Sequence, residues 1–118
     1  SFVFAGGDTW LKVAINIEKA LNDALKEYER GNTNQAMEKV ADTYFGIFEG
    51  EKANMEIAIR RFLSLKRMTE LEKGFSDLRK AMFSKAPVTD IKKQTANLAD
   101  AVKNAAKELD RKGVRLEQ

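Results

Sequence analysis

The stretch TDIKKQTANLADAVKNAAKELDRKG, residues 89–113, decides the fold of this chain. Its apolar and small residues recur at alternating steps of four and three, which places them on one side of an α-helix and fits no β-strand. We therefore predict an amphipathic helix from a Thr89 cap to about Lys112, stopped by Gly113. Its seam suits near-parallel helix packing and consists of Ile91, Thr95, Leu98, Val102, Ala105 and Leu109.

The same type of pattern predicts three earlier helices, over residues 8–31, 32–50 and 52–84. Asp8 or Thr9 is a suitable cap for the first. Because the join between the first and second helices is so short, the two must be antiparallel neighbours. The predicted inward-facing residues are Trp10, Val13, Ile17, Leu21, Ala24 and Tyr28 in the first helix, and Ala36, Met37, Val40, Ala41, Tyr44, Phe45 and Phe48 in the second.

The third helix is expected to be the longest, from about Lys52 to about Ser84. Gly74 lies inside it and marks either a bend or the close approach of a neighbouring helix. Pro87 prevents the helix from continuing. The predicted core positions are Met55, Ile59, Phe62, Leu65, Met68, Leu71, Phe75, Leu78 and Met82.

Four amphipathic helices with short turns predict an all-α domain, an antiparallel up-down-up-down four-helix bundle. We expect one domain over residues 1–118, with a bundle at 8–112 and a tail at 113–118. Residues 1–7 are interpreted as the end of a secretory signal, a linker or a cloning scar.

The composition excludes several classes of site. The chain has no histidine and no cysteine, which excludes Ser-His-Asp and Cys-His catalysis and the ordinary zinc, copper and haem ligands. Oxygen ligands remain, and they suit hard ions such as Ca²⁺, Mn²⁺ and ferric iron. The net charge of +3 is mild and gives no reason to expect nucleic acid as a partner. We predict that the chain is not an enzyme.

Acidic residues gather around the join between the second and third predicted helices. Asp42 and Glu49 are seven residues apart and would share a helix face, while Glu56 lies in the first turns of the next helix. A tight turn at Gly50 would bring these acids to one end of the bundle, with Glu51 beside them. The alternative is that they are solvated surface groups, or that they pair with Arg60 and Arg61.

Two other features have plainer interpretations. Arg60, Arg61, Lys66 and Arg67 form a basic run that could touch lipid headgroups or an acidic partner, but such a run is more often a solvated face. The aromatic residues near position 45 are expected to belong to the core.

Aromatic, small and acidic residues recur together through most of the chain. The pattern comprises Trp10, Ile17, Leu21, Tyr28, Gly31-Asn32, Asp42, Tyr44-Phe45, Phe48-Glu49, Asn54-Met55-Glu56 and Ile59, followed by Leu71-Glu72, Phe75, Leu78-Arg79 and Met82. It resembles the extracytoplasmic N-terminal domain of bacterial high-affinity iron permeases, the oxidase-dependent iron transporter family. Asn54 departs from the small residue, usually glycine, that commonly stands at this position in the family.

The resemblance implies a periplasmic, membrane-proximal domain that is followed by its own transmembrane permease domain. The family's Arg-Glu-x-x-Glu transport motif does not occur here, so the expected role is to receive or guide iron, or to dock an iron-delivery partner. Glu49 and Glu56 match the acidic positions of the domain motif, and Asp42 matches its upstream acid. Together with the secondary candidates Glu51 and Tyr44, they are the predicted iron-site residues.

Two other functions remain open from the residues. One is a ligand-sensing helical bundle from a membrane receptor, since such domains have a similar size. The other is a protein-docking bundle without a ligand.

Overall fold

The computed structural model describes residues 9–51 and 53–116, in which all the regular secondary structure is helical and no strand occurs. The predicted leader 1–7 and the alternative cap Asp8 lie outside the described residues. The helical segments are α1 (Trp10–Glu29), α2 (Thr33–Thr43), the π-helix η1 (Tyr44–Phe48), α3 (Met55–Phe62), α4 (Leu65–Phe83) and α5 (Val88–Arg111).

The ends of α1 follow the predicted signals. The Thr9 hydroxyl accepts a hydrogen bond from the amide of Lys12 at 3.2 Å and so caps the first turn. At the other end Gly31 takes a positive φ of 86°, which a residue without Cβ adopts without strain. The chain then turns directly into α2, whose flanking residue Asn32 makes no side-chain cap.

The second predicted helix changes its winding before it ends. After Thr43 the chain forms one π-helical stretch, in which the amide of Glu49 donates to the carbonyl of Tyr44 at 2.9 Å, five residues back. The wider turn rotates the following side chains relative to those of α2. Gly50 then stands beside the carbonyls of Gly46 and Ile47, where a Cβ would lie 2.9 Å and 3.1 Å from the two oxygens.

The predicted single helix over residues 52–84 is wrong, because the structure breaks it into α3 and α4. Leu63 leaves helical geometry and Ser64 is extended, with φ −167° and ψ 153°. The Ser64 hydroxyl accepts from the amide of Arg67 at 3.0 Å, so it starts a new helix. The start is also later than expected: Asn54 caps α3 by accepting from the amide of Ile57 at 3.0 Å.

The last helix spans the predicted residues with one change at its start. It begins at Val88, directly after Pro87, so Thr89 lies inside the helix instead of capping it. Gly113 has a φ of 71° and ends the helix as predicted. Beyond it the chain still contacts the core, because the Val114 carbonyl accepts from the Trp10 indole nitrogen at 3.0 Å.

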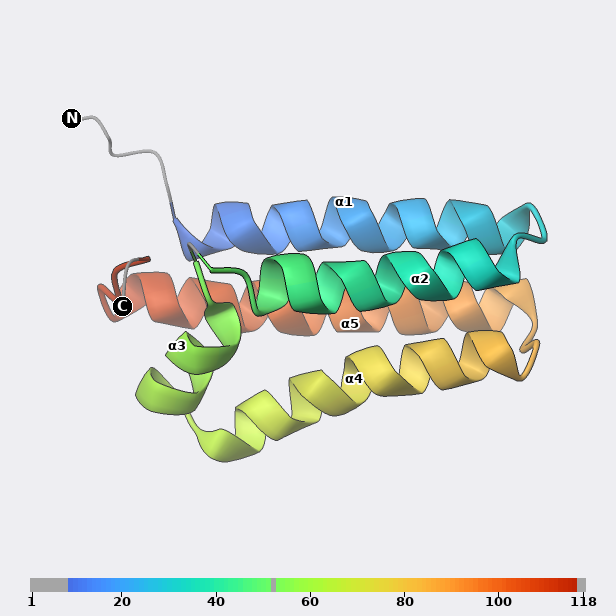
Figure 1. Ribbon diagram of the computed structural model, residues 1–118. Helices are drawn as coiled ribbons and strands as arrows, with labels where there is room; N and C mark the ends of the chain where they lie inside the picture. The colour runs from blue at the N-terminus through green and yellow to red at the C-terminus, as the bar shows by residue number, and fades with distance from the viewer. Residues whose placement is uncertain (1–8, 52, 117–118) are drawn as a thin grey trace.

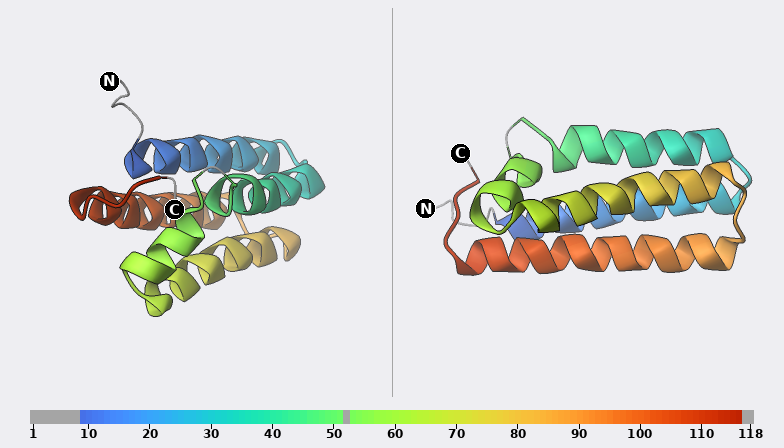
Figure 2. Two further views of the ribbon diagram at one scale, coloured as in Figure 1. Left: turned by 60° about the vertical axis from the view of Figure 1, so that its left-hand side comes forward. Right: turned by 90° about the horizontal axis from the view of Figure 1, so that it is seen from below.

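The long helices lie side by side and alternate in direction along the chain (Figure 1). The short α3 sits across one end, next to the first turns of α4, while the α1–α2 and α4–α5 turns share the opposite end (Figure 2). One continuous core runs between the helices and contains most of the predicted inward positions. Two predicted core residues are instead largely exposed, Phe45 at 65% and Leu65 at 62%. In the described residues, no helix combines the length and apolar character needed to span a membrane.

Candidate functional site

Three glutamates from three segments converge near the end of the molecule that carries α3. Glu49 follows η1, Glu56 lies in the first turn of α3, and Glu72 lies on α4. One carboxylate oxygen from each lies within 4.8 Å of the others. We call these three residues the carboxylate cluster.

Glu56 is the buried member of this cluster, with only 5% of its surface exposed. A buried carboxylate is costly unless a partner compensates its charge. Arg60, one turn later on α3, donates to Glu56 Oε2 and provides this compensation while its own side chain remains half exposed. Each carboxylate has two oxygens, and the Glu56–Arg60 pair uses Oε2.

Tyr44 joins the cluster from the π-helical turn. Its hydroxyl donates to Glu72 Oε2 at 2.8 Å. Burial, followed by the interactions with the Glu72 and Glu49 carboxylates, raises the pKa of the Tyr44 phenol well above its ordinary value of 10.0. A phenol is already protonated at neutral pH, and the raised pKa keeps Tyr44 a hydrogen-bond donor further into the alkaline range.

The ring of Tyr44 is held in place by other aromatic rings. It packs at 5.0 Å from Phe45, 5.6 Å from Phe48 and 5.2 Å from Phe75, measured between ring centroids. These contacts fix the phenol hydroxyl and, through it, the position of the Glu72 carboxylate.

Two of the four predicted acids belong to the carboxylate cluster, and the other two do not. Glu49 and Glu56 meet, as expected, but Asp42 and Glu51 are exposed and outside the cluster. The face shared by Asp42 and Glu49 was inferred for an α-helix, and the π-helical turn between them changes that phase. Glu72 was missed, because on a single long helix it would lie far from Glu56.

The cluster offers a hard-oxygen donor set. Three carboxylates within reach of one another suit Ca²⁺, Mn²⁺ or ferric iron and do not suit soft metals. The donors come from Glu49, Glu56 and Glu72, two of which also accept hydrogen bonds from neighbouring side chains. An ion bound here would have an incomplete protein shell and would exchange readily.

No protein-family model, curated protein or solved structure matches this chain. The resemblance to iron permeases therefore stays a prediction.

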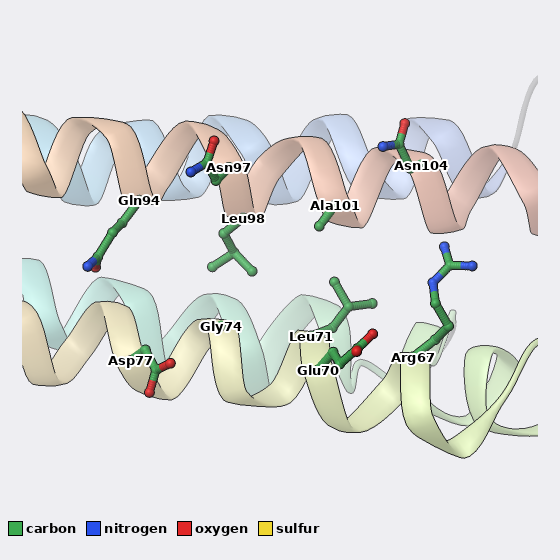
Figure 3. A pocket seen from close by; sticks show the side chains of 10 residues that line it. All are labelled: Arg67, Glu70, Leu71, Gly74, Asp77, Gln94, Asn97, Leu98, Ala101 and Asn104. Atoms are coloured by element: carbon green, nitrogen blue, oxygen red, sulfur yellow. The ribbon is translucent and has the colours of Figure 1, made fainter.

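A hollow separate from the carboxylate cluster lies between α4 and α5, with a volume of about 470 Å³ (Figure 3). Leu71 and Leu98 form its buried floor, and Gly74 allows the close approach of α5, since a Cβ there would lie 2.8 Å from Leu98 Cδ1. At one end Arg67 reaches α5 and pairs with Glu108 at 2.6 Å. The remaining wall residues are Glu70, Asp77, Gln94, Asn97, Ala101 and Asn104.

The basic run is divided between two helices. Arg60 is on α3 and pairs with Glu56, whereas Arg67 is on α4 and pairs with Glu108. The break at Ser64 separates the two arginines that a single helix would have placed on one face.

Proposed function

We propose that this chain is an extracytoplasmic, membrane-proximal domain that receives or guides iron through Glu49, Glu56 and Glu72, as part of an iron-permease-type transporter. The observation that carries the proposal is the convergence of these carboxylates from three separate segments. Two of them, Glu49 and Glu56, are the acids that the family resemblance singles out.

The fold is an antiparallel up-down-up-down four-helix bundle made of α1, α2, α4 and α5, with α3 as an extra helix at one end. The alternating directions of these helices support this topology, as does the core they share. A bundle is a suitable frame for such a site, because side chains from facing helices converge at fixed positions.

An exchangeable site fits a transport role better than a closed site does. The cluster supplies three protein ligands, one buried, one half-buried and one exposed. Water or a delivery partner's ligands can fill the other positions of a six-coordinate ion. A cation can therefore enter and leave without unfolding of the bundle.

The test is calorimetric titration of the purified domain with chelated ferric iron, ferrous iron, Mn²⁺ and Ca²⁺. The variant Glu49→Gln/Glu72→Gln removes two ligands and leaves the buried Glu56–Arg60 pair intact. The matched control, Asp42→Asn/Glu51→Gln, removes two exposed acids outside the cluster. We expect saturable binding of at least one ion in the wild type and control, and loss of that binding in the first variant.

Absence of binding in the folded wild-type domain would refute the metal site. An equal loss of ion binding in both double variants would mean that binding depends on the overall charge of the domain and not on the carboxylate cluster. Either result would favour a docking bundle whose partner carries the iron.

The α4–α5 hollow supports a second candidate, a ligand-sensing bundle of a membrane receptor. Amide side chains of Asn97 and Asn104 line it above an apolar floor, a combination typical of pockets for small polar ligands. A screen of amino acids and dicarboxylates by thermal shift, with Asn97→Ala/Asn104→Ala as the test variant, separates this candidate from the first. A ligand that raises the Tm of the wild type, but not that of Asn97→Ala/Asn104→Ala, would favour the ligand-sensing function.

A further inference from the structure

The turn between α4 and α5 forms one end of the molecule, away from α3 (Figures 1 and 2). It is anchored to the adjacent helix pair by two contacts. The Tyr28 hydroxyl donates to the Ala86 carbonyl, and Lys85 Nζ donates to the Thr33 hydroxyl at 3.2 Å. The side chains around this turn therefore project from a fixed frame.

Positive charge is concentrated around this turn. Residues 79–93 hold five basic side chains and one acid, Asp90, whereas the whole chain has a net charge of only +3. Outside this segment the chain is therefore close to neutral. We call residues 79–93 the basic tip, and its cations are Arg79, Lys80, Lys85, Lys92 and Lys93.

All five cations of the basic tip are exposed. Within residues 9–51 and 53–116, none of them takes part in an ion pair. The neighbouring α1–α2 turn contributes the acids Glu27 and Glu29, but Glu27 is already paired with Arg30 at 3.0 Å. The positive field of the tip is thus largely uncompensated.

Two apolar side chains stand among these cations. Phe83, the last residue of α4, is 73% exposed, and Val88, the first residue of α5, is 41% exposed. An exposed aromatic residue with lysines on both sides of it in the sequence is typical of surfaces that bind the membrane interface. There the ring enters the headgroup region while the ammonium groups contact phosphates.

We propose that the basic tip docks on an anionic phospholipid surface, with Phe83 inserted at the headgroup level and the five cations on lipid phosphates. Each basic side chain near such a surface strengthens binding roughly fivefold, and the attraction weakens with salt. The inference does not depend on metal binding. It adds an orientation, because a domain docked by this tip directs α3 and the carboxylate cluster away from the lipid.

The test is vesicle flotation at low and high salt. The lipids are equimolar phosphatidylglycerol and phosphatidylcholine, compared with phosphatidylcholine alone. The variant Lys92→Gln/Lys93→Gln removes two tip cations, and Lys12→Gln/Lys107→Gln removes the same charge from exposed positions at the other end of the molecule. We expect salt-sensitive binding to the anionic vesicles, weakened by more than tenfold in the first variant and nearly unchanged in the control.

A second measurement follows the ring itself. In Phe83→Trp the new indole should shift its emission to the blue with anionic vesicles and not with phosphatidylcholine, while Trp10 stays buried and constant. Equal binding to both vesicle types, equal losses in the two lysine variants, or no binding at low salt would overturn the proposal. The last outcome would leave the tip as a surface for an acidic protein.

Discussion

The carboxylate of Asp110 joins the last helix to the first. Its Oδ1 accepts from the amide of Trp10 at 2.8 Å, and its Oδ2 accepts from the amide of Leu11 at 3.0 Å. Thr9 takes the next amide, that of Lys12. The first-turn amides of α1 would otherwise lack partners, and two of them depend on a residue from the far end of the chain.

Replacement of this residue, Asp110→Ala, should lower the free energy of unfolding by about 2–4 kcal/mol. A hydrogen bond to a charged group contributes roughly 1.5–3 kcal/mol, and two bonds from one side chain do not add fully. Loss of an anion at a helix N-terminus costs about another 0.3–1 kcal/mol. For a domain of this size each kcal/mol shifts Tm by roughly 3–6 °C, so we expect a fall of about 10 °C.

Urea unfolding, followed by the fluorescence of Trp10 and by circular dichroism, measures this loss. Asp100→Ala is the matched control, because Asp100 is exposed and its nearest cation, Lys103, is 3.7 Å away. The control should change stability by less than about 0.5 kcal/mol. If Asp110→Ala were equally mild, the carboxylate would not hold the two helix ends together, and the reasoning would be refuted.

Three further substitutions test the cluster and its frame. The raised pKa of Tyr44 means that its phenol ionises first in the unfolded chain as the pH rises, so the wild-type protein loses stability above about pH 10 and Tyr44→Phe should lose less. Urea unfolding midpoints, measured against pH in the presence of a chelator, test this. Parallel pH curves for the wild type and the variant would contradict it. Gly50→Ala places a methyl group against backbone oxygens and should cost about 1–3 kcal/mol by thermal unfolding, unlike Gly46→Ala, which meets nothing. Ser64→Ala removes the cap of α4 and should cost about 1 kcal/mol, whereas Ser76→Ala should cost nothing.

The sequence predicts a helix and its buried face correctly where the apolar residues recur regularly and the helix ends carry capping or glycine signals. In α5 the steps of four and three alternate, and in α1 every step is three or four residues without two successive steps of three. Thr9, Gly31 and Gly113 mark three of the four ends of these helices. The predicted stripes of these two helices are buried as expected, with Val13 only partly so. In such helices the local sequence preference agrees with the packing of the whole domain, so the predicted helix is the one that forms.

The break between α3 and α4 was missed although the spacing contained a signal for it. From Ile59 to Leu71 the apolar residues advance by four successive steps of three, through Phe62, Leu65 and Met68. Each step of three falls about 60° short of a full helical turn, so such a stripe winds away from any single contact face. The chain resolves the conflict by restarting the helix at Ser64, and Leu65 is left exposed.

The restart of the helix is also what creates the carboxylate cluster. Glu56 and Glu72 are sixteen residues apart, which on one continuous helix would separate them by about 24 Å along the axis. In the folded chain their oxygens lie within 4.8 Å, because α3 folds back across the start of α4. A single helix over residues 52–84 would place Glu72 outside the site. The same geometry makes the cluster depend on the Ser64 cap. Weakening the cap should therefore loosen the cluster and reduce the metal binding proposed for it, without removing any of its carboxylates.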